Sequence, residues 1–226
     1  MVWGTLRYRE RTQTPVTPPP AQIHNPPPAV TTQQEFVNLD VPFISEAPEG
    51  IWKNPWVNAC EEASIAMVEN FYAGRKSVNV QEAKVYMQML FDAQDRLYGS
   101  NVNSDAARTV KIINDYTSFK GTIKDNPTIE DIKEELRQGR PVISLHYGFG
   151  LQNKNISFLA TGSSYHMMAI RGFDDKNQEF ITNDDGDKVD GPNHRYDYNL
   201  FMSTIHDYIF ATGKANGPAR VIFTSQ

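Results

Sequence analysis

Only one of the 226 residues is a cysteine, so the chain cannot form an intramolecular disulfide or a zinc site built from several cysteines. No apolar run approaches the roughly 20 residues that a membrane-spanning helix needs. Basic residues are few and scattered, 22 Lys and Arg against 27 Asp and Glu, which argues against nucleic-acid binding. The overall composition, with 39% hydrophobic and 11% aromatic residues, is typical of a globular protein with a packed core.

Residues 1–35 differ in composition from the rest of the chain. Half of the 14 prolines lie between positions 15 and 28, with Thr and Gln between them and almost nothing to bury. This pattern predicts a disordered, polyproline-II-like linker, followed by one globular domain over residues 36–226. A stalk of this kind would suit a cell-surface or extracytoplasmic protein, whereas residues 1–10 lack the apolar core of a signal peptide. Localisation therefore stays open.

The hydrophobic pattern changes its period near the middle of the domain. Helical spacing and N-cap residues predict helices beginning at Asn58, Asn79, Ser104 and Thr128. Apolar runs then predict buried strands over 141–146, 165–173, 179–183 and 219–224, with a short strand near 37–41, a polar loop over 184–196 and a helix over 200–209. Helices followed by antiparallel strands indicate an α+β fold.

The single cysteine, Cys60, falls in the first turn of the helix that Asn58 is predicted to cap. Glu61 would complete the capping box, and Glu61 and Glu62 would be charges at the helix start. A helix N-terminus lowers the pKa of a thiol, and the thiolate is the nucleophile of cysteine hydrolases. The alternative interpretation is that Cys60 is a small buried hydrophobic residue.

A cysteine nucleophile needs a base, and His166 is the best candidate among the five histidines. It begins a predicted strand directly after a Gly-Ser-Ser loop, and the next strand runs back beside it to Asp184. A carboxylate there can orient the imidazole, which gives the predicted triad Cys60, His166 and Asp184. His146 also lies on a strand, whereas the remaining histidines, His24, His194 and His206, are expected in the tail or at the surface. The aspartates around Asp184 resemble a calcium loop only weakly, and a solvated acidic loop is expected.

Four patches occur in an order that resembles a known family: residues 41–48 with Trp52, residues 59–64, residues 139–143, and residues 165–174 with 180–184. Together they resemble the bacteriocin-processing-peptidase-like (double-glycine-peptidase-like) family of papain-fold cysteine peptidases. The resemblance implies N-terminal helices packed on a C-terminal antiparallel sheet, and hydrolysis of a peptide or protein through a thioester acyl-enzyme. Cys60 would be the nucleophile, His166 the base and acid, and Asp184 the orienting group. It implies no cofactor and no metal.

The chain departs from the family at Glu46, where members usually have a Gln that donates to the oxyanion. An ionised Glu only accepts hydrogen bonds, whereas a protonated Glu can still donate. The backbone N–H of Cys60 could also serve alone. The alternative hypothesis is therefore a catalytically impaired module that binds peptide or cell-wall ligands. A third hypothesis is acyl transfer, in which an amine replaces water at the same thioester.

Overall fold

The computed structural model describes Met1, residues 34–157 and residues 164–226. Nearly all of the predicted linker, and part of the predicted loop before Tyr165, lie outside these residues. The compact unit that carries the fold spans Gln34–Gln226. Among the described residues, no helix is long and apolar enough to cross a membrane.

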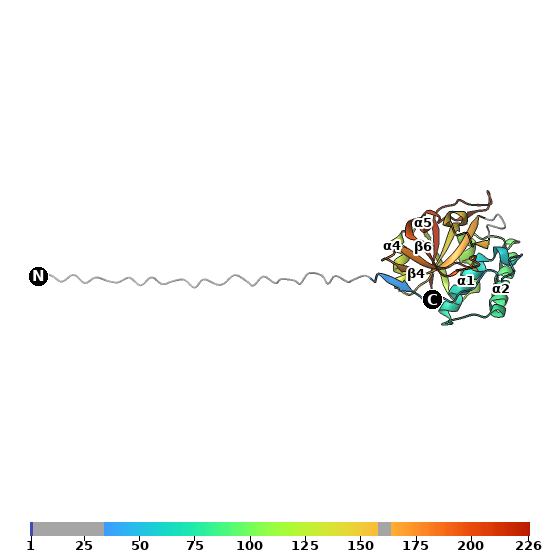
Figure 1. The fold of residues 1–226 in the computed structure, drawn as a ribbon, viewed down its shortest axis with the longest axis horizontal. Helices are drawn as coiled ribbons and strands as arrows, with labels where there is room; N and C mark the ends of the chain where they lie inside the picture. The colour runs from blue at the N-terminus through green and yellow to red at the C-terminus, as the bar shows by residue number, and fades with distance from the viewer. Residues whose placement is uncertain (2–33, 158–163) are drawn as a thin grey trace. The chain divides into compact units, whose positions relative to one another are not determined.

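A seven-stranded antiparallel sheet forms the centre of the fold (Figure 1). Its strands are β1 (Phe36–Asn38), β2 (Lys120–Asp125), β3 (Val142–Tyr147), β4 (Tyr165–Asp174), β5 (Glu179–Asn183), β6 (Pro192–Asp197) and β9 (Arg220–Ser225), in the order β2-β9-β3-β4-β5-β6 with β1 added to β4. The two short strands β7 (Tyr208–Ile209) and β8 (Lys214–Ala215) pair separately.

The four buried strands predicted from the sequence are confirmed, but β2 and β6 were missed. Both lie at the ends of the strand order and are largely polar, with sequences Lys-Gly-Thr-Ile-Lys-Asp and Pro-Asn-His-Arg-Tyr-Asp. Edge strands carry charged and polar residues because one side faces water, which hides them from a search for apolar runs. The polar loop predicted over 184–196 therefore ends in a strand.

The helices are α1 (Cys60–Tyr72), α2 (Val80–Tyr98), α3 (Ala106–Tyr116), α4 (Ile129–Arg137) and α5 (Tyr198–Ser203), with short 3-10 helices η1 (Trp56–Asn58) and η2 (Gly148–Leu151). The predicted caps Asn79 and Thr128 are confirmed, each within a complete capping box. The helix predicted to reach residue 209 instead ends at Ser203, and β7 follows it.

The predicted caps Asn58 and Ser104 are wrong by one residue. Asn58 ends η1, and α1 begins after Ala59 without a side-chain cap. Asp105 caps α3, because Ser104 makes other bonds: its hydroxyl donates to Gln94.

Side chains alternate along the sheet between two apolar cores. Met167 and Ala169 of β4 face the core formed with α1, α2 and α3, whereas Met168 and Ile170 face the core formed with α4 and α5. Figure 1 shows α1 and α2 on one side of the strands and α4 and α5 on the other. The predicted α+β class is confirmed, and the first turns of α1 lie buried against the sheet.

Candidate active site

Cys60 and His166 line the same small cavity, whose volume is about 10 Å³. It is also lined by Glu46, Val57, Asn58, Asn103, Ser157 and Tyr165. Cys60 is the first residue of α1 and His166 is the second residue of β4. A cavity of this size is about large enough for one water-sized group. Hollows of about 450 and 380 Å³ elsewhere contain neither Cys60 nor His166.

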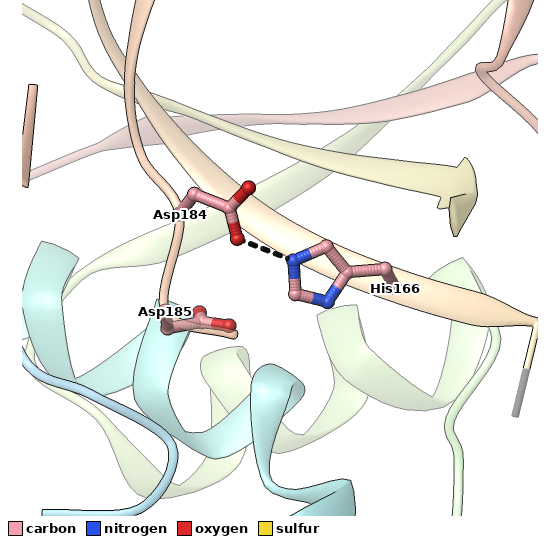
Figure 2. Close-up of side chains that lie close together, drawn as sticks. All are labelled: His166, Asp184 and Asp185. Atoms are coloured by element: carbon pink, nitrogen blue, oxygen red, sulfur yellow. Dashed lines mark hydrogen bonds and ion pairs between the residues drawn. The ribbon is translucent and has the colours of Figure 1, made fainter. Parts of the chain in front are cut away.

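His166 and Asp184 form a buried hydrogen-bonded pair. The β4–β5 hairpin places Asp184, directly after β5, close to the start of β4, and Asp184 Oδ1 lies 2.8 Å from His166 Nε2. Figure 2 shows the second ring nitrogen, Nδ1, turned away from Asp184. Burial alone would lower the pKa of His166, but the charge and hydrogen bond of Asp184 outweigh it and raise that pKa.

The second carboxylate oxygen of Asp184 is hydrogen-bonded as well. The Tyr196 hydroxyl donates to Asp184 Oδ2, and Asn153 Nδ2 donates to the same oxygen at 3.3 Å. Burial by itself raises the pKa of Asp184, but the charge and hydrogen bond of His166, together with Tyr196, hold it below its usual value. Sequence reasoning missed Tyr196 because strand β6, which carries it, was not recognised, and no local signal indicated Asn153.

Residues 184–187 form a buried turn, called the acidic turn below. The Asp187 N–H donates to the Asp184 carbonyl at 3.1 Å, and the side chains of Asp184, Asp185 and Asp187 are buried. The predicted solvated acidic loop is therefore wrong for these three residues, whereas Asp190, which belonged to the same prediction, is exposed. Gly186 is required here because a Cβ at this position would lie 2.8 Å from His166 Cε1. Any larger residue would push the imidazole from its place.

The acidic turn also holds the residues on the other side of the cavity. The Glu46 N–H donates to the Asp185 carbonyl at 3.1 Å, and the Ser157 N–H donates to the Gly186 carbonyl at 2.9 Å. The Asp185 side chain accepts a hydrogen bond from Ser64 of α1 at 3.0 Å. One turn thus connects His166, helix α1 and the backbones of Glu46 and Ser157.

The Cys60 thiol donates a hydrogen bond to Glu61 Oε2 at 3.1 Å, and Glu61 Oε1 accepts from the Ser104 N–H at 2.6 Å. Burial raises the pKa of Cys60, and the carboxylates of Glu61 and Glu46 raise it further. The predicted lowering of this pKa is therefore wrong. The effect of the helix N-terminus is outweighed because the thiolate would be buried among carboxylates.

Two more carboxyl groups are buried beside these. Glu62 accepts a hydrogen bond from Gln94, and burial and the charge of Glu61 raise its pKa well above the usual range. Burial and the charge of Glu46 do the same to the pKa of Asp185, whose Oδ1 has no hydrogen-bond partner among the described residues. Glu61 and Glu62 are therefore core residues, and the prediction of simple helix-start charges is wrong.

Glu46 hydrogen-bonds to the Ser157 hydroxyl and is itself buried. Burial raises its pKa to about 8, although the charge of His166 and the hydrogen bond from Ser157 oppose this. Glu46 is therefore mostly protonated at neutral pH, when its carboxyl group can donate a hydrogen bond.

The other described histidines lie outside the cavity. His146 pairs with His166 in the strand register, but burial lowers its pKa to about 3, and its Nδ1 lies 2.9 Å from Thr204 Oγ1. His194 and His206 were expected to be solvated, yet both are partly buried. His194 Nδ1 lies 3.2 Å from Asp187 Oδ2, and His206 Nδ1 lies 3.0 Å from the Gly217 carbonyl.

His166, Asp184 and Asp185 are also the described residues whose geometry could hold a metal ion. One donor atom from each lies within 4.8 Å of the others (Figure 2). In this structure His166 Nε2 and Asp184 Oδ1 are already hydrogen-bonded to each other. The sequence-based expectation of no metal and no cofactor stays a prediction.

Replacing Asp184 by Asn tests the pair without changing its shape. Because the charge of Asp184 raises the pKa of His166 against burial, Asp184→Asn is expected to lower the pKa of His166, and the imidazolium should lose its proton at lower pH. NMR titration of the histidine Cε1–H signals measures this. An unchanged His166 titration would contradict the assigned pairing.

Comparison with known proteins identifies the fold and the family. The family model of the Peptidase_C39-like family matches residues 38–213. A crystal structure of a candidate C39-like peptidase from Bacillus anthracis superposes with a TM-score of 0.55 at 14% identity, covering 85% of this chain and 98% of that one. At this identity the superposition supports the papain-like α+β fold alone. No curated protein matches the chain. The family match covers most of the globular domain, and the chain belongs to the Peptidase_C39-like family of papain-fold proteins.

Proposed function

We propose that the protein is a cysteine peptidase in which Cys60 is the nucleophile, His166 transfers protons and Asp184 orients the imidazole. The observation that carries this proposal is the 2.8 Å hydrogen bond between Asp184 and His166. It orients an imidazole that lines the same cavity as Cys60. Family membership supports a peptide or protein substrate.

The hydrogen bond to Asp184 occupies His166 Nε2, so Nδ1 is the nitrogen that exchanges a proton with Cys60. His166 accepts the thiol proton while the sulfur attacks the peptide carbonyl carbon, and the carbonyl π electrons move to the oxygen. His166 then gives its proton to the departing amine as the C–N bond breaks, which leaves a thioester on Cys60. Water, deprotonated by His166, hydrolyses the thioester.

The raised thiol pKa makes proton removal part of the attack. Before substrate binds, Cys60 is a neutral thiol that donates to Glu61. Transfer to His166 therefore accompanies attack, and the site does not store a thiolate. Since the pKa of His166 is also raised, the rate should rise with pH as His166 loses its own proton.

Two groups near Cys60 can stabilise the developing oxyanion. Cys60 is the first residue of α1, so its backbone N–H has no acceptor four residues earlier within the helix. Glu46 lines the same cavity and is mostly protonated at neutral pH, so its charge does not oppose an oxyanion there. The Glu at this position is therefore compatible with catalysis below about pH 8.

A second candidate function is a catalytically impaired module that binds peptide or cell-wall ligands. The burial of the Cys60 thiol against Glu61 is the observation that favours it, because burial and the Glu61 charge raise the thiol pKa, and a poorly ionised thiol is a weak nucleophile. Acyl transfer to an amine is a variant of the peptidase proposal and uses the same residues. Adding an amine would divert the thioester to an amide if such transfer occurs.

Cleavage of a peptide mixture tests the proposed function. The full chain is incubated with a tryptic digest of a denatured protein, and new peptide termini are identified by mass spectrometry. Wild-type protein should generate new termini, and Cys60→Ala should generate none while unfolding at the same temperature. Cleavage that persists in Cys60→Ala, or no cleavage by either protein, would contradict the peptidase assignment.

The pH dependence of Glu46→Gln tests the protonated carboxyl. With a pKa of about 8, Glu46 should be about nine-tenths ionised at pH 9, so Glu46→Gln should then exceed wild type by roughly tenfold in kcat/KM. At pH 6.5 the two rates should be similar, because both side chains can donate.

The ratio of the two rates is the quantity to measure, because titrations that the charge of Glu46 does not influence cancel in it. The titratable groups that interact with Glu46 are Cys60, Glu61, Glu62, His166, Asp184 and Asp185. Glu49→Gln is the matched control, because Glu49 lies exposed in the same segment and pairs with Lys84. A ratio that stays constant from pH 6.5 to 9 would remove Glu46 from the oxyanion site.

A further inference from the structure

Ser157 is a buried hydroxyl residue that sequence reasoning did not single out. It lines the cavity of Cys60 and His166, and its side chain is 1% exposed. Its hydroxyl is hydrogen-bonded to Glu46 Oε1. A serine hydroxyl has one hydrogen to donate and can accept as well, so its bonding to Glu46 depends on which partner supplies the hydrogen.

The backbone around Ser157 fixes the position of this hydroxyl. The Ser157 N–H donates to the Gly186 carbonyl at 2.9 Å, and its neighbour Ile156 forms a β-bridge with Asp187. Both contacts are to the acidic turn, which also carries Asp184, the partner of His166. Ser157 and His166 are therefore held by the same turn, which keeps the hydroxyl and the imidazole at fixed positions relative to each other.

The protonation state of Glu46 decides where the Ser157 hydrogen points. An ionised Glu46 only accepts, so it would hold the Ser157 hydrogen. A protonated Glu46 can donate to Ser157 Oγ, which leaves the Ser157 hydrogen available to another acceptor in the cavity. That acceptor would be the carbonyl oxygen of a bound substrate.

We propose that Ser157 is a catalytic residue that donates its hydroxyl hydrogen to the oxyanion, with Glu46 acting as the donor to Ser157. This inference rests on the proposed peptidase function and names the group that replaces the amide expected at position 46. The pair Glu46–Ser157 then does what a single Gln side chain does: it presents one N–H or O–H to the developing charge.

The hydrogen bond from Ser157 to the oxyanion involves no proton transfer and no oxidation or reduction. As the sulfur of Cys60 bonds to the carbonyl carbon, the C=O π pair becomes a lone pair on oxygen, and the Ser157 hydrogen bond to that oxygen strengthens. When the tetrahedral intermediate collapses, the pair re-forms the C=O bond and the C–N bond breaks. The hydrogen stays on Ser157 throughout, so Ser157 is needed for attack on a carbonyl and for no other reaction of the thiol.

This distinction gives the experiment two readouts on the full chain. Hydrolysis of a cleaved peptide forms an oxyanion, whereas alkylation of Cys60 by iodoacetamide displaces iodide and forms none. At pH 6.5, Ser157→Ala should lower kcat/KM for hydrolysis by roughly 10²–10³, the cost of losing one oxyanion donor. Its alkylation rate should stay within about twofold of wild type, because Cys60 and His166 are unchanged.

Two further variants complete the test. Ser157→Thr keeps the hydroxyl and should recover most of the lost hydrolysis. Ser144→Ala removes a buried hydroxyl that bonds the Met168 carbonyl within the sheet, and it should leave both rates near wild type. Binding of a peptide aldehyde, which forms an oxyanion on Cys60, should weaken in Ser157→Ala in parallel with hydrolysis.

The possible outcomes separate this inference from the proposed function. Hydrolysis by Ser157→Ala at the wild-type rate would overturn the role of Ser157 and leave the peptidase assignment intact. Equal losses of hydrolysis and alkylation would also overturn it, because they would show a structural effect on Cys60. If wild-type protein neither hydrolyses peptides nor depends on His166 for alkylation, the proposed function fails, and the role of Ser157 fails with it.

Discussion

The acidic turn, residues 184–187, is the constraint on which the rest of the site depends. Its side chains and backbone carbonyls hold groups from separate parts of the chain. Asp184 binds His166, the Asp185 carbonyl holds the Glu46 backbone, and the Gly186 carbonyl holds the Ser157 backbone. The glycine in the turn leaves room for the imidazole. The turn therefore helps to set the positions of His166, Glu46 and Ser157 around the cavity.

The pKa values of two adjacent carboxyl groups in this turn are shifted in opposite directions, because the charge of His166 lies beside Asp184 whereas burial and the charges of Glu46 and Asp184 act on Asp185. Asp184 accepts from His166, Tyr196 and Asn153, and its pKa is lowered. Among the described residues, Ser64 alone donates to the Asp185 side chain, and the pKa of Asp185 is raised. Two neighbouring carboxyl groups whose pKa values are shifted in opposite directions commonly take different roles in catalysis. Asp184 can orient a positive imidazolium, while Asp185 adds no charge to a crowded site.

The effect of burial on pKa values also explains how several acidic side chains can be buried beside Cys60. Glu46 and Glu62 have raised pKa values because burial disfavours their charged forms. Protons on these groups remove the repulsion that a thioester mechanism would otherwise meet. Glu61, which binds both the Cys60 thiol and the Ser104 N–H, is the carboxylate that most directly delays ionisation of the thiol.

Sequence patterns predicted the parts of this structure that depend on local or apolar signals. The capped helices at Asn79 and Thr128 and the buried strands β3, β4, β5 and β9 were recognised for that reason. The juxtaposition of His166 and Asp184 followed from hairpin geometry.

Burial of charged groups could not be predicted in the same way. Glu61 and Asp185 look like surface residues in the sequence, because only the tertiary packing of α1 against the acidic turn removes water from them. The same packing reversed the expected shift in the Cys60 pKa. Ser157 and Tyr196 come from a loop and an edge strand, neither of which carries a pattern that indicates a site.

The central claim is that His166 acts on Cys60, and the pH dependence of Cys60 alkylation by iodoacetamide tests it most directly. The rate should rise with pH in wild-type protein because the thiol pKa is raised. At pH 7.5, His166→Ala should react at about one tenth of the wild-type rate or below, since the imidazole that accepts the thiol proton is then missing. His206→Ala, which removes a partly buried histidine whose Nδ1 lies 3.0 Å from the Gly217 carbonyl outside the cavity, should match wild type. Equal rates for wild type and His166→Ala at every pH would contradict the account.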